Sequence, residues 1–127
     1  MKEILISALI IAIIFSFGIV VQKYLKNTGN EITEELIKLK KLIIEDKNNA
    51  EIQECANSIL NKWNKIEEIW ATIIMHEELD NIEVSLISLK AQIENGKKQE
   101  AMEEIDKSKF WIKHIEEKEA IKIKNIF

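Results

Sequence analysis

The chain has 127 residues, about the length of one domain, which argues against a multidomain enzyme. With no Pro, three Gly and one Cys, it is not a disulfide-stapled miniprotein, a collagen-like chain or a Gly- and Pro-rich disordered protein. All 18 basic residues are Lys, and the formal net charge is −4; residues 27–127 hold 15 Lys against 21 Asp or Glu. Because nucleic-acid-binding domains carry a basic surface, we expect no nucleic-acid partner.

The first predicted element is an apolar helix over residues 4–21, which contain no ionisable side chain. Eighteen residues at 1.5 Å each reach about 27 Å, close to the roughly 30 Å thickness of a hydrocarbon core. Lys23 and Lys26 end the apolar run, and Tyr24 between them suits a membrane interface. The pattern predicts a single-pass transmembrane anchor within residues 1–26 and a separate domain over residues 27–127.

A cleaved signal peptide is the competing interpretation of this segment. Signal peptides have an apolar core of about 7–15 residues, followed by small residues at the cleavage site. Ile19, Val20 and Val21 follow Gly18 and offer no such site, so we expect the anchor to stay attached. Lysines flank the apolar run on both sides, so the charge rule for membrane orientation is nearly tied.

One face of the predicted anchor carries small side chains. Ala8, Ala12 and Ser16 recur at every fourth position. Small residues in this spacing let two helices approach closely within a bilayer. This face is a candidate for packing against another membrane helix, and a homo-oligomer is left open; the alternative is that small residues occur in membrane anchors by chance.

Residues 27–30 read as a short polar linker before the body of the chain. A helical stripe then follows in steps of four, three and four residues. Its members are Ile32, Leu36, Leu39 and Ile43. The polar residues 46–49 predict the turn that ends this helix.

The strongest periodic signal begins at about residue 50 and alternates steps of four and three residues, which is typical of a packed helix. Its members are Ile52, Ala56, Ile59, Trp63, Ile66, Trp70 and Ile73. Trp63 and Trp70 are seven residues apart and share one face, so we expect both to be large anchors of the core.

The same spacing continues after residue 78, where Leu86 and Leu89 are expected to anchor the core. Residues 75–80 contain neither Gly nor Pro, so residues 50–94 form either one kinked helix or two helices. Gly96 suits the left-handed position that ends a helix, and a last helix is predicted over about residues 98–117. The tail over residues 120–127 is expected to dock as an extended segment or to fray.

These elements predict an all-α fold. Its architecture is an N-terminal single-pass transmembrane helix followed by a helical-hairpin bundle of three or four helices.

The best candidates for a chemical role are His76, Asp80 and Glu83. They lie at positions i, i+4 and i+7, so a continuous helix would place them on one face, where they could bind a divalent metal ion. A solvated acidic turn is the simpler interpretation, because no second His follows at metal-binding spacing.

No other pattern indicates catalysis. The three glycines form no phosphate-binding loop, no Ser lies in a Gly-x-Ser-x-Gly turn, and Cys55 has no basic partner in the sequence. We therefore expect no catalytic residue, no cofactor and no enzymatic activity, with Cys55 serving as a small buried hydrophobe.

The segment from Trp70 through His76 to residues 80–90, followed by Phe110 and His114, resembles an uncharacterised membrane-anchored helical family of low-GC Gram-positive bacteria, known as domain of unknown function 4363. The similarity spans nearly the whole chain. It implies a bacterial plasma-membrane protein whose body lies outside the cytoplasm, and it implies no activity.

The sequence thus favours a membrane-tethered interaction or accessory module whose partners are the lipid bilayer and another membrane or envelope protein. Two alternatives remain at this stage. One is an extracytoplasmic domain that binds a ligand or a metal ion, and the other is a single-pass coiled-coil subunit of a membrane complex.

Overall fold

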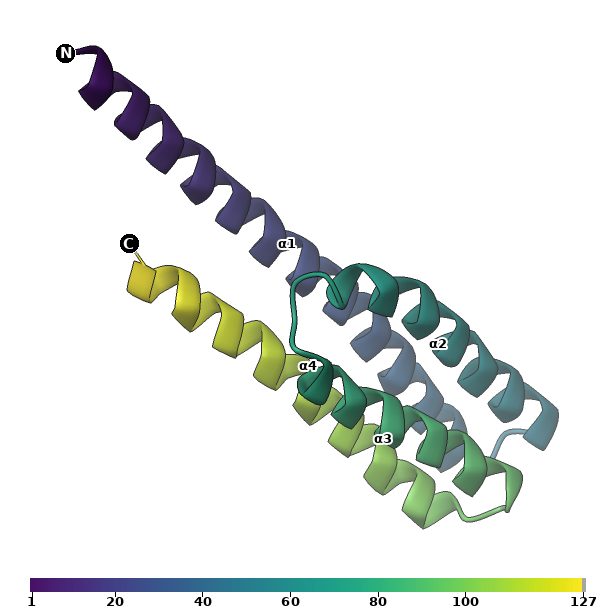
Figure 1. Cartoon of the computed structure of the whole chain (residues 1–127). Helices are drawn as coiled ribbons and strands as arrows, with labels where there is room; N and C mark the ends of the chain where they lie inside the picture. The colour runs from purple at the N-terminus through teal and green to yellow at the C-terminus, as the bar shows by residue number, and fades with distance from the viewer. Residues whose placement is uncertain (127) are drawn as a thin grey trace.

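The computed structural model describes residues 1–126, all of whose regular elements are helices (Figure 1). Helix α1 comprises Lys2–Ile44, α2 Asn49–Trp70, α3 His76–Glu94 and α4 Lys98–Ile126. The second half of α1 forms an antiparallel four-helix bundle with the other three, in which α1 contacts α2 and α4, and α3 contacts α2 and α4. The expected all-α fold is confirmed, with four helices.

Helix α1 runs without a break from the apolar segment into the bundle, so the linker expected at residues 27–30 is wrong. Its 43 residues extend about 65 Å. The side chains along its buried face alternate steps of four and three residues, beginning before residue 27. The buried positions are Leu25, Gly29, Ile32, Leu36, Leu39 and Ile43. Packing on this face therefore keeps the polar residues 27–30 helical.

Two of these polar residues make contacts that require the helix. The Thr28 hydroxyl donates to the Tyr24 carbonyl oxygen at 2.8 Å and accepts a hydrogen bond from Trp70 Nε1 at 2.9 Å. A Cβ atom on Gly29 would lie 3.1 Å from Cγ2 of Ile112, which shows how closely α4 approaches α1 here. The Thr28 hydroxyl thus links α1 to α2, and the lack of a side chain at Gly29 leaves room for α4 to pack closely.

Residues 50–94, which the sequence leaves open as one helix or two, form α2 and α3. The turn between them is built on the Trp70 carbonyl oxygen, which accepts from the amides of Ile73 at 2.9 Å and Ile74 at 2.8 Å. Ile74 is buried and fixes the turn to the core. A single apolar side chain turned inward therefore replaces the Gly or Pro that usually marks such a reversal.

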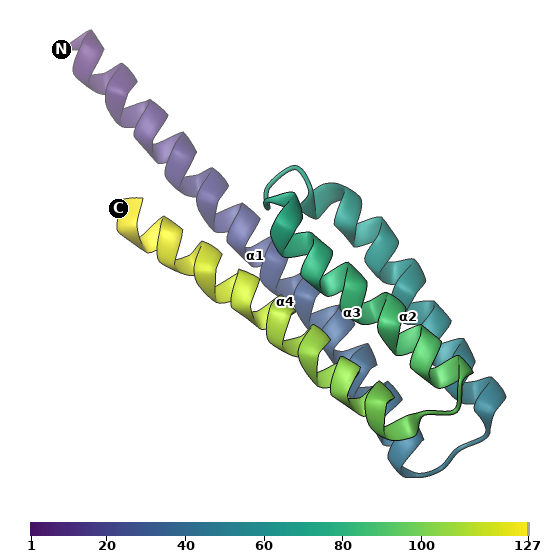
Figure 2. The ribbon, with the colours of Figure 1, turned by 60° about the horizontal axis from the view of Figure 1, so that its bottom comes forward.

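The other two turns follow sequence signals. The Asn48 side chain accepts from the amide of Glu51 at 3.1 Å and caps the start of α2. Gly96 has φ of +70°, the left-handed conformation expected of it at the end of α3. Both turns lie at the end of the bundle far from the apolar segment (Figure 2).

The tail expected to be extended or frayed is instead the last part of α4, which stays helical to residue 126. Residue 127 lies outside the described residues. Beyond the ends of α2 and α3, this part of α4 continues beside α1 toward the apolar segment (Figures 1 and 2). The Ile123 side chain lies 3.8 Å from the position of a Cβ atom on Gly18.

Candidate interaction groove

Open grooves border the exposed face of α2. Three amide side chains, Asn57, Asn61 and Asn64, occupy positions i, i+4 and i+7 of this helix, and all three are exposed. Asn57 and Asn64 directly follow buried residues of the α2 stripe, Ala56 and Trp63. The amides therefore lie at the edge of the core, on the side that faces α3. Amide groups both donate and accept hydrogen bonds.

The facing wall of this groove comes from α3. Ile87, which is 56% exposed, lies between Glu83 and Lys90 in the same four–three spacing. The groove is open and has a volume of about 620 Å³. Its lining residues are Asn57, Leu60, Asn61, Trp63, Asn64, Glu83, Ile87 and Lys90. We call this feature the α2–α3 groove.

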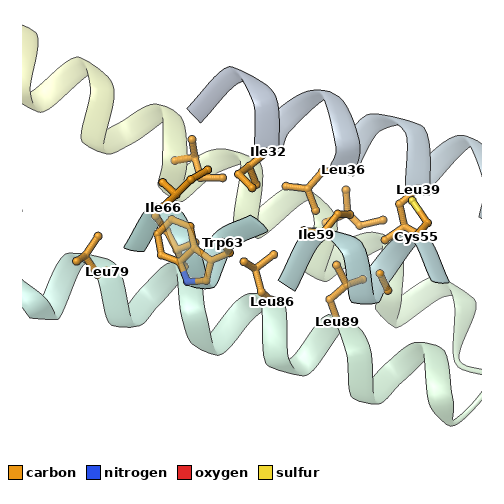
Figure 3. Close-up of a cluster of buried hydrophobic side chains, with 14 of the residues drawn as sticks. Ile32, Leu36, Leu39, Cys55, Ile59, Trp63, Ile66, Leu79, Leu86 and Leu89 are labelled. Atoms are coloured by element: carbon orange, nitrogen blue, oxygen red, sulfur yellow. The ribbon is translucent and has the colours of Figure 1, made fainter. Parts of the chain in front are cut away.

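Trp63 forms part of the floor of the groove and is 1% exposed. Its ring meets that of Trp70 edge to face, with centroids 5.7 Å apart. The indole nitrogen of Trp63 lies on the side of the ring nearest α3 (Figure 3) and has no hydrogen-bond partner among the described residues. Trp70, by contrast, donates to Thr28. An unpaired buried N–H costs about 1–3 kcal/mol.

The residues expected to anchor the core are buried. Trp63, Trp70, Leu86 and Leu89 are each at most 2% exposed. They join Ile59 and Leu79 in one apolar cluster between the helices (Figure 3). Only Trp63 among the four also lines the groove.

His76, Asp80 and Glu83 lie in the first part of α3, at the end of the bundle from which the apolar segment projects, and Glu83 also lines the α2–α3 groove. Burial raises the pKa of Glu67 above its ordinary value, and the negative charges of Glu83 and Asp80 raise it further, while His76 opposes them. These groups therefore share one electrostatic environment. Even so, nowhere in residues 1–126 do three or more His, Cys, Asp or Glu side chains form a group that could hold a metal ion.

Cys55 is buried and forms no disulfide within the described residues. Burial raises the pKa of its thiol, and the carboxylate of Glu35 raises it further. A thiol of raised pKa is a poor nucleophile, so this side chain acts as a small packing residue.

The small residues Ala8, Ala12 and Ser16 lie on the part of α1 that projects from the bundle, and all three are exposed. One helix of the described chain, α1, is long and apolar enough to cross a membrane. Its most apolar stretch of 18 residues has a mean hydropathy of 3.0 and none of it is buried.

The groove was not anticipated from the sequence, although its signal is present there. The three asparagines follow the same spacing as the core residues beside them, but each amide read singly is an ordinary polar surface residue. The facing residues of α3 could not be assigned to the groove without knowing that residues 71–75 reverse the chain.

The family model described as Domain of unknown function (DUF4363) matches residues 19–126, so the chain belongs to this family. The matched region begins at the end of the apolar segment and includes the whole bundle with the extension of α4. No curated protein and no solved structure matches the chain.

Proposed function

We propose that this member of the DUF4363 family is a membrane-tethered binding protein whose α2–α3 groove holds an extended segment of another membrane or envelope protein. The observation that carries the proposal is an open groove lined by the amides of Asn57, Asn61 and Asn64 and by the ring of Trp63, whose buried N–H has no acceptor among the described residues. The function is binding, and the chain performs no catalysis.

The tether is supported by the part of α1 that leaves the bundle. Its large apolar side chains are exposed, including Ile6 at 58%, Leu9 at 61% and Phe17 at 68%. A core helix of a soluble protein would be covered by its neighbours, and monomeric soluble proteins rarely expose apolar patches beyond a few hundred Å². A bilayer covers such a helix completely and leaves no backbone group unpaired.

The continuity of α1 sets the height of the groove above this bilayer. Thr28 lies seven residues beyond the apolar boundary at Val21, and Trp70 bonds to it. Since α2 runs toward the membrane and ends at Trp70, Asn64 and Asn57, which precede Trp70, stand about 20 and 30 Å above the boundary at 1.5 Å per residue. Headgroups occupy only about 5–8 Å on each side. The groove therefore faces water at a height that the juxtamembrane part of another membrane protein can reach.

The chemistry of the groove fits a polypeptide backbone. In an extended segment every second residue presents an N–H and a C=O to the same side, with a repeat of about 6.6–6.8 Å. Asn57 and Asn61 are separated by about 6 Å along the helix, which places their amides close to this repeat. Leu60 and Ile87 offer apolar contacts beside them. Uncharged amides bind a backbone without demanding a charged sequence.

The two alternatives are less well supported. A metal-binding function would use His76, Asp80 and Glu83, which form no ligand group in the described chain. A coiled-coil subunit would need a free apolar seam, but the seams of the four helices are occupied by one another. We place the chain in the bacterial plasma membrane, with its body outside the cytoplasm, on the strength of the family resemblance.

The tether is tested by alkaline extraction of membranes from cells that express the full chain. We expect the wild-type chain to stay in the pellet and the Ile10→Lys/Ile11→Lys variant to be released, because each central Lys costs about 2.5–3.5 kcal/mol of insertion. Both positions are exposed and outside the bundle. Release of the wild-type chain, or loss of its first two dozen residues on maturation, would refute the tether. Protease treatment of intact cells reports the side on which the body lies.

The groove is tested by photocrosslinking in cells from a benzoylphenylalanine placed at Asn61, with Glu103 on the outer side of α4 as the control position. We expect one membrane or envelope protein to be crosslinked from Asn61 and not from Glu103, through a single segment of its sequence. A synthetic peptide of that segment should bind the full chain in detergent micelles.

Binding of the peptide then reports the role of the amides. Removing two amides should weaken it roughly tenfold, since each hydrogen bond contributes about 0.5–1.5 kcal/mol. The test variant is Asn57→Ala/Asn61→Ala, and Gln53→Ala removes an exposed amide outside the groove as the control. Equal binding by the test variant and the wild type would refute the groove while leaving the tether intact.

A further inference from the structure

The end of α4 extends past the bundle to the level of the apolar segment of α1. Helix α2 ends at Trp70, opposite Thr28, whereas α4 continues to residue 126. Ile123 contacts α1 at Gly18, 3.8 Å from the position that a Cβ atom would take. Both ends project on the same side of the bundle (Figure 2).

This contact fixes the depth of the α4 end relative to the proposed span. Gly18 lies three residues inside the apolar boundary at Val21, or about 4–5 Å along the helix axis. The α4 end therefore cannot stand clear of a bilayer that α1 crosses. Its last two turns lie at the level where hydrocarbon gives way to headgroups.

The residues at this level differ from the rest of the body. Residues 120–126 contain three Ile and two Lys and no acid, whereas residues 27–119 contain 13 Lys against 21 acidic residues. Ile121 is 59% exposed, and Lys122 and Lys124 are exposed beside it. Glu119, one turn before, pairs with Lys122 at 3.0 Å, which leaves half of the Lys122 side chain exposed.

Helix α1 contributes charges of the same sign at the same level. Lys23 and Lys26 directly follow the apolar run and are exposed. Lysines with apolar neighbours at a membrane boundary extend their ammonium groups to the headgroups while their stems stay in the apolar layer. Each lysine close to an anionic surface strengthens its attraction about fivefold.

We infer that residues 120–126 of α4 form a second membrane contact, which binds the headgroups of anionic phospholipids next to the span. Lys122 and Lys124 pair with lipid phosphates, and Ile121 enters the edge of the acyl layer. This inference rests on the proposed tether, because the span sets the depth of the α4 end. With two points of attachment, the bundle is held upright, and the α2–α3 groove keeps a constant height.

The test uses the full chain in vesicles of phosphatidylcholine with about one third phosphatidylglycerol, in a Cys55→Ala background. A fluorophore is attached to one new cysteine, and nitroxide-labelled phospholipids serve as quenchers. The three label sites are Ile10→Cys in the span, Asn125→Cys at the α4 end and Gln99→Cys at the far end of α4. We expect quenching at positions 10 and 125 and none at position 99.

Lipid preference tests the role of the lysines. With the label at position 125, nitroxide phosphatidylglycerol should quench at least about twofold more strongly than nitroxide phosphatidylcholine at equal mole fraction. Lys122→Gln/Lys124→Gln should bring this ratio close to one. Lys107→Gln/Lys109→Gln is a matched control, since its lysines have the same spacing and Lys107 pairs with Glu104 as Lys122 pairs with Glu119.

The outcomes separate the inference from the tether on which it rests. Quenching at position 10 without quenching at position 125 would overturn the second contact and leave the tether, and would mean that something other than lipid covers the α4 end. No quenching at position 10 would overturn both. Equal quenching by the two nitroxide lipids at position 125 would overturn the preference for anionic headgroups.

Discussion

Replacement of Thr28 by Val tests the tie between α1 and α2. Val has nearly the shape of Thr, so the change removes the hydroxyl and little else. Trp70 is fully buried, and the Thr28 hydroxyl accepts the hydrogen bond from its indole N–H at 2.9 Å. Leaving that N–H unpaired should cost about 1–3 kcal/mol of unfolding free energy. Thr28→Ser keeps the acceptor and should cost less than about 1 kcal/mol.

The measurement is urea unfolding of the full chain in dodecyl maltoside micelles, followed by tryptophan emission. With a urea m-value of about 1–3 kcal/mol/M, the midpoint of Thr28→Val should fall by roughly 0.5–2 M, and that of Thr28→Ser by much less. Equal midpoints for Thr28→Val and the wild type would refute the stated role of Thr28.

Three further predictions use the same assay. Gly29→Leu should destabilise the bundle by about 1–3 kcal/mol, because its side chain would meet Ile112 where a Cβ atom alone lies at 3.1 Å. Burial raises the pKa of Glu116 above the ordinary 4.5, so the folded state holds this proton more tightly than the unfolded chain. The free energy of unfolding should therefore fall as pH rises from about 4.5 through the raised pKa. The fall should stay below about 1 kcal/mol because the carboxyl is half-exposed, and Glu116→Gln should remove it. Asn48→Ala should cost about 1 kcal/mol by removing the cap on the Glu51 amide, whereas Asn49→Ala should not.

The sequence predicts the buried seams well because each follows from local periodicity. The stripe that contains Trp63 and Trp70 is buried from Ile52 to Trp70, although its last predicted member, Ile73, lies in the turn beyond α2 and is only partly buried. The sequence signal at Gly96 marks a real helix end. A side chain repeated every three or four residues leaves a helix few ways to bury its apolar face. Burial of such a stripe can be predicted without knowing which helices pack against it.

The wrong predictions all concern residues whose conformation depends on distant partners. Thr28 and Gly29 look like linker residues, since their composition is polar and flexible. Their helical state follows from Trp70, 42 positions away, and from the approach of α4. The end of α4 likewise stays helical beside Gly18, where Ile123 packs. Tertiary contacts override weak local propensity at each of these positions.

The unbroken α1 gives the proposed tether a mechanical property that a flexible linker would lack. Because one helix forms both the proposed span and one wall of the bundle, a change of tilt in the membrane turns the whole bundle with it. A tilt of about 20°, the average for transmembrane helices, displaces a groove 25 Å above the boundary by about 9 Å. A partner helix packed on Ala8, Ala12 and Ser16 would therefore influence where the α2–α3 groove stands, although it touches no residue of the groove. The end of α4, which packs on Gly18 through Ile123, opposes this motion toward one side, because a tilt toward α4 would push its lysines deeper into the bilayer.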